Sequence, residues 1–194
     1  MSELSEIDQL SAGVRKLGGA KALAFGICLL ERAMPAFFQF QCDTGWVGGG
    51  VMRAALARCW AVLEGGPAEV AKFVSIAECE RVMPDSEARH ASDYTSAAID
   101  AVDIACNLLG FIENGDIELI VASVTAQTDT IDLFVRQSDG SAHSLLEDEL
   151  DLMRGDLEFI NAVEADPTVL FPALLKRVSD LEYRTLRLKL PRTS

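Results

Sequence analysis

The sequence predicts a single all-α domain of about seven helices, and three observations lead to this prediction. Residues Ala22–Leu30 are apolar on every side, so a helix there must be surrounded by protein. Residues Asp93–Ile112 have a second, almost equally apolar helical pattern with one narrow polar strip. Elsewhere, apolar residues mostly recur at the spacing of an amphipathic helix. We therefore expect one domain over residues 1–194, built around two largely buried helices at Ala22–Met34 and Asp93–Ile112.

The first half of the chain contains four expected helices. Residues 2–17 have the pattern of a short amphipathic helix, which should end at the two glycines that follow. The central helix should stop near Pro35, because proline fixes φ and disfavours helix in the residue before it. Residues 51–63 have the spacing of a buried helical face. Pro67 follows two glycines and is suited to the first position of another helix, which should end near Glu80.

Ser92 is a plausible N-cap for the second central helix. The following Asn114-Gly115 has two interpretations. Asn-Gly is a hairpin signal, and the residues after it are rich in β-branched side chains. However, the residues before it are helical in pattern, and the apolar residues after it keep helical spacing. We therefore interpret Asn114-Gly115 as a helix C-cap and Asp116 as the cap of the next helix.

The last part of the chain predicts two more helices and a tail. Ser144 and Glu147 form a capping box in front of an amphipathic helix that reaches about Ala165. Another helix should follow Pro167. The final residues alternate apolar and basic side chains, as an extended strand would, so we expect residues 183–194 to form an extended tail.

The net charge of −13 is unevenly distributed. Residues 113–166 contain fourteen acidic residues and two basic ones. An acidic surface repels nucleic-acid phosphates and anionic membranes, so we expect neither as a partner. Such a run is usually a solvated face, and the alternative is a docking face for a basic protein. The leading hypothesis for function is a non-enzymatic interaction or regulatory module with an acidic binding face, which leaves a homo-oligomer open as well.

Five cysteines and no C-x-x-C pair suit a reducing compartment, and they argue against a disulfide framework or a zinc site. No apolar run approaches the roughly 20 residues that span a bilayer. The N-terminal region lacks a basic head and a small-residue cleavage site, so it does not resemble a secretory signal. We expect a cytoplasmic protein without a cofactor.

Candidate functional residues are all charged. The pattern Glu-Arg-x-Met-Pro occurs at Glu31–Pro35 and again at Glu80–Pro84. The two copies could mark a duplicated helix pair, but coincidence explains them equally well. Two aspartates lie on the polar strip of the second central helix, and the first of them is the natural counter-charge for Arg32 or Arg81, because buried carboxylates usually have a charge partner. The candidate cluster is Glu31, Arg32, Glu80, Arg81, Asp100 and Asp103.

The alternative hypothesis is a small-molecule-binding or metal-dependent enzyme with a site near Glu31, Arg32, Asp100 and Asp103. No catalytic pattern supports a particular reaction. The chain has two histidines, and its single Glu-x-x-His, ending at His90, cannot build a di-iron centre alone. The three glycines at 48–50 lack the lysine of a phosphate-binding loop.

One stretch resembles a known family. Residues Cys28–Pro35, followed by Thr44-Gly45-Trp46, the glycines and Trp60, are similar to the YjaG-like bacterial family of unknown function, domain of unknown function 416. A proline turn at Pro84 and Ile99-Asp100-Ala101 are similar too, and the resemblance covers roughly residues 24–109. It implies an all-helical cytoplasmic protein and supplies no catalytic residue.

Overall fold

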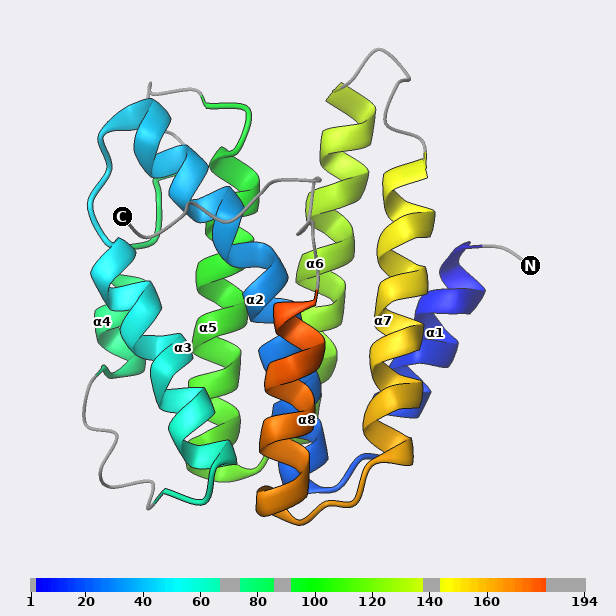
Figure 1. The fold of residues 1–194 in the computed structure, drawn as a ribbon. Helices are drawn as coiled ribbons and strands as arrows, with labels where there is room; N and C mark the ends of the chain where they lie inside the picture. The colour runs from blue at the N-terminus through cyan, green and yellow to red at the C-terminus, as the bar shows by residue number, and fades with distance from the viewer. Residues whose placement is uncertain (1–2, 67–73, 86–91, 138–143, 181–194) are drawn as a thin grey trace.

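The protein is an all-α bundle, as the sequence predicts. The structure is a computed structural model that describes residues 3–66, 74–85, 92–137 and 144–180, and within these ranges every regular element is one of eight helices. The helices lie side by side, most of them with nearly parallel axes (Figure 1). Their bounds are α1 Glu3–Val14, α2 Gly19–Thr44, α3 Gly49–Leu63, α4 Ile76–Glu80, α5 Thr95–Asn114, α6 Ile117–Gln137, α7 Ser144–Ala162 and α8 Pro167–Ser179.

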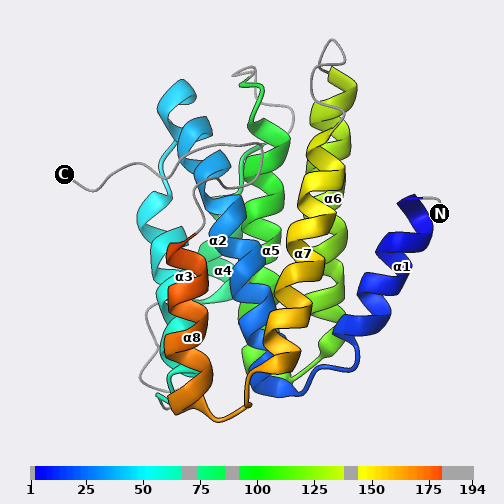
Figure 2. The same ribbon diagram turned by 45° about the vertical axis from the view of Figure 1, so that its right-hand side comes forward.

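The two predicted central helices are at the centre. Helix α2 contacts α3, α5, α6, α7 and α8, and α5 contacts α2, α3, α4 and α6. In both views α3 and α4 lie on one side of this central pair, and α6 and α7 lie on the other (Figures 1 and 2). Every residue from Ala22 to Leu30 is buried. The apolar pattern of this stretch is therefore explained by its place in the core.

A close approach of α2, α5 and α6 depends on Gly26. A Cβ atom at this position would lie 3.0 Å from Leu108 of α5 and 3.1 Å from Ile120 of α6. Glycine in a helix interior costs roughly 0.5–1 kcal/mol relative to alanine. At Gly26, the missing side chain leaves room for Leu108 and Ile120, so α5 and α6 can pack closely against α2.

The expectation that the central helix stops near Pro35 is wrong. Helix α2 continues through Pro35 to Thr44, and it ends where Gly45 adopts a left-handed φ of 73°. Proline in a helix interior removes one hydrogen bond and costs about 3 kcal/mol. The burial of Pro35, Phe37 and Phe40 in the core offsets that cost. Packing thus overrides a reliable local stop signal, and α2 visibly bends along its length (Figure 1).

The prediction of one helix from Pro67 to about Glu80 is wrong at residues 74 and 75. Residues 67–73 lie outside the described residues, and Val74 and Ser75 are not helical. Helix α4 begins only at Ile76, where Ser75 and Glu78 form a capping box that our reading of the sequence missed. Helix α5 likewise begins at Thr95, two residues later than expected, although Ser92 Oγ does accept a hydrogen bond from the Tyr94 N–H at 3.1 Å.

The interpretation of Asn114-Gly115 as a cap is confirmed. Gly115 has a φ of 74°, and its N–H donates to the Phe111 carbonyl at 2.8 Å, which closes α5. Asp116 then accepts a hydrogen bond from the Glu118 N–H at 3.0 Å and opens α6. Farther on, Asp166 caps α8 through the Thr168 N–H. The expected tail at residues 183–194 lies outside the described residues.

Helices α2 and α5 are long and apolar enough to cross a membrane by length and composition alone. Their most apolar 18-residue windows have mean hydropathies of 1.3 and 1.4, and 83% and 56% of these windows are buried inside the bundle. Core helices of globular proteins meet the same criteria. Burial within the bundle therefore accounts for their composition.

Candidate functional site

The most unusual side chain in the structure is Arg32, a guanidinium in the middle of the apolar helix α2. Its exposed fraction is 0%, and it is the largest of the fully buried side chains in the described part of the chain. An arginine is almost never fully buried without a charge partner, because transfer of the charge from water is costly. The residues that surround Arg32 are therefore the best starting point for a functional site.

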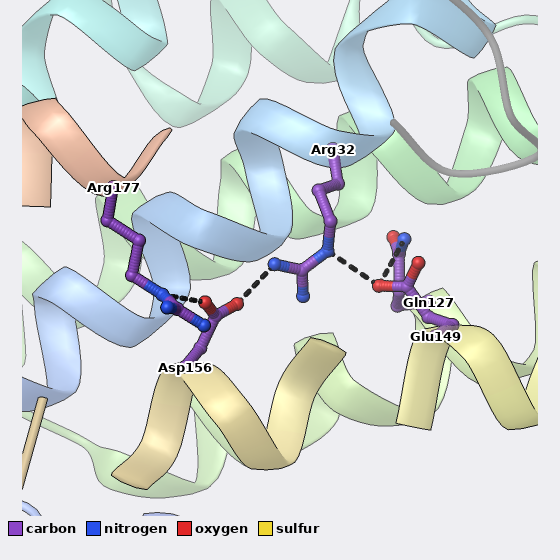
Figure 3. A network of polar contacts seen from close by, with 5 residues as sticks. All are labelled: Arg32, Gln127, Glu149, Asp156 and Arg177. Atoms are coloured by element: carbon purple, nitrogen blue, oxygen red, sulfur yellow. Dashed lines mark hydrogen bonds and ion pairs between the residues drawn. The ribbon is translucent and has the colours of Figure 1, made fainter. Parts of the chain in front are cut away.

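Two carboxylates of α7 hold Arg32. The Nε atom donates to Glu149 Oε1 at 2.7 Å, and Nη1 donates to Asp156 Oδ2. These carboxylates are 3% and 1% exposed. They are seven residues apart, which is close to two helical turns, so both project from the same face of α7 toward α2 (Figure 3).

Two further residues extend the pair into a network over four helices. Gln127 of α6 donates from Nε2 to Glu149 Oε1 at 3.3 Å. Arg177 of α8 donates from Nε to Asp156 Oδ1 at 2.6 Å. Figure 3 shows Arg32 between the two carboxylates, with Gln127 beyond one and Arg177 beyond the other. We call Arg32, Gln127, Glu149, Asp156 and Arg177 the buried charge network.

The charges of this network balance, since two guanidinium groups face two carboxylates. Burial lowers the pKa of Arg32, but the charges of Glu149 and Asp156 outweigh it, so its pKa is raised and the group stays protonated. Its Nη2 atom is buried and has no hydrogen-bond partner among the described residues. The network is therefore fixed in charge and lacks one hydrogen bond.

Arg177 fits against α7 because residue 155 is glycine. A Cβ atom on Gly155 would lie 3.1 Å from Arg177 Nη2. The Arg177 guanidinium also lies over the Phe159 ring, with Cζ 5.0 Å from the ring centroid, in a cation–π contact. The Arg177 side chain is 26% exposed, so it connects the buried carboxylate to the surface.

An open pocket of about 330 Å³ lies at this outer end of the network. Its lining residues are Phe159, Ala173, Lys176, Arg177 and Asp180. The two basic residues also stand in the last turn of α8, where cations are stabilised by the helix dipole. The pocket contains none of the six residues of the predicted cluster.

The structure does not bring the six predicted residues together. The predicted pairing of Arg32 with Asp100 is wrong, because the partners of Arg32 come from α7. The alternative pairing of Asp100 with Arg81 is wrong as well, since Arg81 is exposed and donates to the Ala77 carbonyl at 3.0 Å. The prediction that Glu31 or Arg32 is desolvated is confirmed by the burial of Arg32.

The other members of the predicted cluster have local partners or lie in solvent. Glu31 is half-buried and accepts a hydrogen bond from Trp60 Nε1 at 3.0 Å. Asp100 accepts one from the Thr130 hydroxyl. Burial raises the pKa of Asp100 to about 6 and also raises that of Asp103. Glu80 is exposed.

The partners of Arg32 were missed although the sequence contains a signal for them. Glu149, Met153, Asp156 and Ile160 follow the spacing of one helical face, and all four are buried. This face therefore combines two acids with two core residues. The long acidic run around them conceals that signal, because most acids in it are exposed.

A metal site does not emerge from the described residues, among which no group of three or more His, Cys, Asp or Glu side chains could hold an ion. Both histidines, His90 and His143, lie outside the described residues. Within this charge-balanced network the two carboxylates are buried and bound by guanidinium groups, so neither is free to accept a proton from a substrate. Chemically it can hold four helices in register, and its exposed edge at Arg177 can meet an anion.

Comparison with known proteins supports the fold. The family model described as protein of unknown function, DUF416, matches residues 9–183. The crystal structure of a DUF416 family protein from Shewanella baltica OS155 superposes with a TM-score of 0.78 at 21% sequence identity, covering 93% of this chain and 98% of that one. Among curated proteins no match was found. Since the family match spans most of the sequence, the chain belongs to the DUF416 family of proteins of unknown function.

Proposed function

We propose that this protein is a non-enzymatic interaction module that presents an acidic face to a basic protein partner. The observation that carries the proposal is the outward side of α7. This side is exposed, and its charged residues are Glu147, Asp148, Asp151, Arg154 and Glu158. We call these residues the α7 acidic stripe.

The stripe is the counterpart of the buried face of the same helix. Glu149 and Asp156 point into the core and are neutralised by arginines, so they contribute no net charge to a partner. The stripe has four acids and one arginine, and that arginine already contacts Glu6 and Asp151. Net negative charge therefore accumulates on one side of one rigid helix, which is the arrangement that steers a basic surface into contact.

The buried charge network supports the same proposal indirectly. It ties α7 to α2, α6 and α8, so the stripe stands on a well-fixed helix. A preorganised surface loses less conformational entropy on binding than a flexible one. We place the interaction in the cytoplasm, in keeping with five cysteines that carry no disulfide.

The experiment compares capture of partners by three forms of the full chain. In the first variant Glu147, Asp148, Asp151 and Glu158 are changed to their amides. The matched control changes four exposed acids elsewhere, namely Glu64, Glu80, Asp85 and Asp93, and alters net charge by the same amount. Both variants should keep the wild-type circular dichroism spectrum.

The expected result is a basic protein that wild type and control retain and the α7 variant loses. Its release should begin as salt rises above about 0.1 M, where the Debye length falls below about 10 Å. Retention of the same proteins by all three forms would contradict the proposal. If the only protein retained is the chain itself, the partner is a second copy, and light scattering of wild type would show the oligomer.

A second candidate function rests on Asp100. A carboxyl group with a pKa of about 6, half-buried on α5, has the property of a general acid or base near neutral pH. The other proposed members of that enzyme site weigh against it. Arg32 is fully buried and paired, and Glu31 is bound by Trp60. Turnover of a substrate with an apparent pKa near 6, abolished by Asp100→Asn, would favour the enzyme over the interaction module.

A further inference from the structure

The open pocket beside α8 has charged side chains that the acidic binding face does not use. Its volume is about 330 Å³, at the lower end of the range for small-molecule sites. Arg177 and Lys176 contribute two cations to its lining, and Asp180 contributes one carboxylate. The remaining lining residues are Phe159 of α7 and Ala173 of α8. The pocket therefore combines an apolar wall with more positive than negative side chains.

Arg177 is held in one orientation on the wall of this pocket. Its Nε atom donates to Asp156 Oδ1 at 2.6 Å, and its Cζ atom lies 5.0 Å from the centroid of the Phe159 ring. Asp156 is 1% exposed and is also bound by Arg32, so it is fixed in the core (Figure 3). A guanidinium that is fixed at two points loses little side-chain entropy when it binds a ligand.

The outer edge of the Arg177 guanidinium is open to a ligand. Its Nε atom is used by Asp156, whereas Nη1 and Nη2 have no hydrogen-bond acceptor among the described residues. Two parallel N–H groups at this edge match the two oxygens of one carboxylate. The side chain is 26% exposed, so a ligand can reach it from solvent. Lys176, which is exposed in the same pocket, offers a second cationic donor.

The charges around the pocket favour a ligand with a single negative charge. Asp180 lines the pocket, and Asp156 lies directly behind the Arg177 guanidinium. The C-terminal end of α8, where the helix dipole is negative, is at the same place. These groups oppose the second charge of a phosphate, whereas a carboxylate brings only one. The side chains of Phe159 and Ala173 form no hydrogen bonds, so the rest of the ligand should be apolar.

We propose that this pocket is a binding site for a small organic carboxylate, whose two oxygens bind the outer edge of Arg177 and whose charge is also met by Lys176. The apolar body of the ligand lies against Phe159 and Ala173. The ligand does not displace Asp156, because the two carboxylates use different N–H groups of Arg177. The site shares no residue with the α7 acidic stripe, so it stands or fails independently of the proposed protein partner.

The test measures the binding of three probes to the full chain by fluorine NMR. The probes are a fluorinated naphthoate, its uncharged amide and the corresponding naphthyl phosphate. The naphthoate should bind with a Kd of roughly 1 mM, as expected for a fragment of this size, and the other two at least about tenfold more weakly. Absence of naphthoate binding up to about 10 mM would overturn the proposal. Binding of the amide or the phosphate as tight as that of the naphthoate would overturn it as well.

Two variants locate the bound probe. Arg177→Gln removes the outer edge of the guanidinium and should abolish detectable binding. Lys176→Glu should weaken naphthoate binding about tenfold. The Lys176 side chain is exposed and has no partner in the part of the chain that the structure describes, so this variant should fold even if Arg177→Gln does not.

The matched control is Lys16→Glu, an exposed position just after α1 that changes the net charge by the same amount. Helix α1 lies on the opposite side of α7 from α8 (Figures 1 and 2), so this variant should bind the naphthoate as wild type does. Wild-type affinity in Lys176→Glu, or an equal loss in Lys16→Glu, would mean that the naphthoate does not bind in this pocket and would overturn the proposal.

Discussion

The sequence Glu-Arg-x-Met-Pro occurs twice in this chain, and its two copies have opposite environments. In the first copy, Glu31–Pro35, the arginine is fully buried inside α2. In the second, Glu80–Pro84, the arginine follows the end of α4 and is exposed. Four of five residues are identical, so the pattern itself does not determine burial. The difference comes from what the rest of the chain packs against each copy.

Each copy is anchored by a different kind of contact. Arg32 is the anchor of the first copy, through two carboxylates of α7. The second copy is held through its variable position, where the carbonyl of Val82 accepts a hydrogen bond from Trp46 Nε1 at 2.9 Å. Val82 also packs against Gly48, because a Cβ atom built on Gly48 would lie only 2.7 Å from the Val82 side chain. The first copy is therefore held in place by its arginine side chain, and the second by a backbone carbonyl.

The largest expected effect is that of Arg32→Ala. Removing Arg32 leaves Glu149 without its guanidinium and Asp156 with only the half-buried Arg177. A buried charge that loses its partner costs about 3–5 kcal/mol of unfolding free energy. Urea denaturation followed by circular dichroism measures this loss. An unchanged midpoint would mean that the buried charge network does not form in solution.

The next effect is a coupling energy, measured between Arg32 and Glu149. Arg32→Ala and Glu149→Ala each leave a buried partner, whereas the double variant removes both charges of that contact. Its loss of unfolding free energy should therefore be smaller than the sum of the single losses, by about 1–3 kcal/mol. Additive losses would show that the two groups act independently and that burial alone sets the cost.

The architecture could be predicted from the sequence better than the charge contacts could. The apolar runs of α2 and α5 identify the core, because a wholly apolar helix has no other stable place in a bundle. The bonds from Arg32 span 117 and 124 positions, and nothing local distinguishes Glu149 and Asp156 among the fourteen acids of residues 113–166. The course of α2 through Pro35 was missed for a related reason, since only tertiary packing offsets the lost hydrogen bond.

Asp100→Asn tests a half-buried charge that lies among like charges. Asp103 and Asp129 add to burial in raising the pKa of Asp100 from 3.8 to about 6, while the Thr130 hydrogen bond opposes the shift. The folded protein thus binds this proton more tightly than the unfolded chain, so stability increases as pH falls from about 6 toward 4.

Asparagine removes the free-energy cost of burying an ionised carboxylate. Its side-chain oxygen can still accept the hydrogen bond from the Thr130 hydroxyl. Because Asp100 is partly exposed to solvent, we expect Asp100→Asn to stabilise the protein by only about 1 kcal/mol at pH 7.5, and by much less at pH 4.5. Urea midpoints at the two pH values measure the difference. A destabilised variant at pH 7.5 would mean that a cation compensates the ionised carboxylate.

The smallest expected effect is that of Arg81→Ala, the equivalent change in the second copy. Arg81 is exposed, and its Nε atom donates to the Ala77 carbonyl of the preceding turn at 3.0 Å. Water replaces such a donor at little cost, and exposed charged groups contribute under about 1 kcal/mol. The variant should unfold within about 0.5 kcal/mol of wild type, while Val82 and Trp46 continue to hold the segment. The same urea titration measures both arginine variants. The difference between their losses of unfolding free energy gives the effect of the surroundings on an arginine in the same local sequence. A loss at Arg81 equal to that at Arg32 would refute burial as the cause, because only one of these arginines is buried.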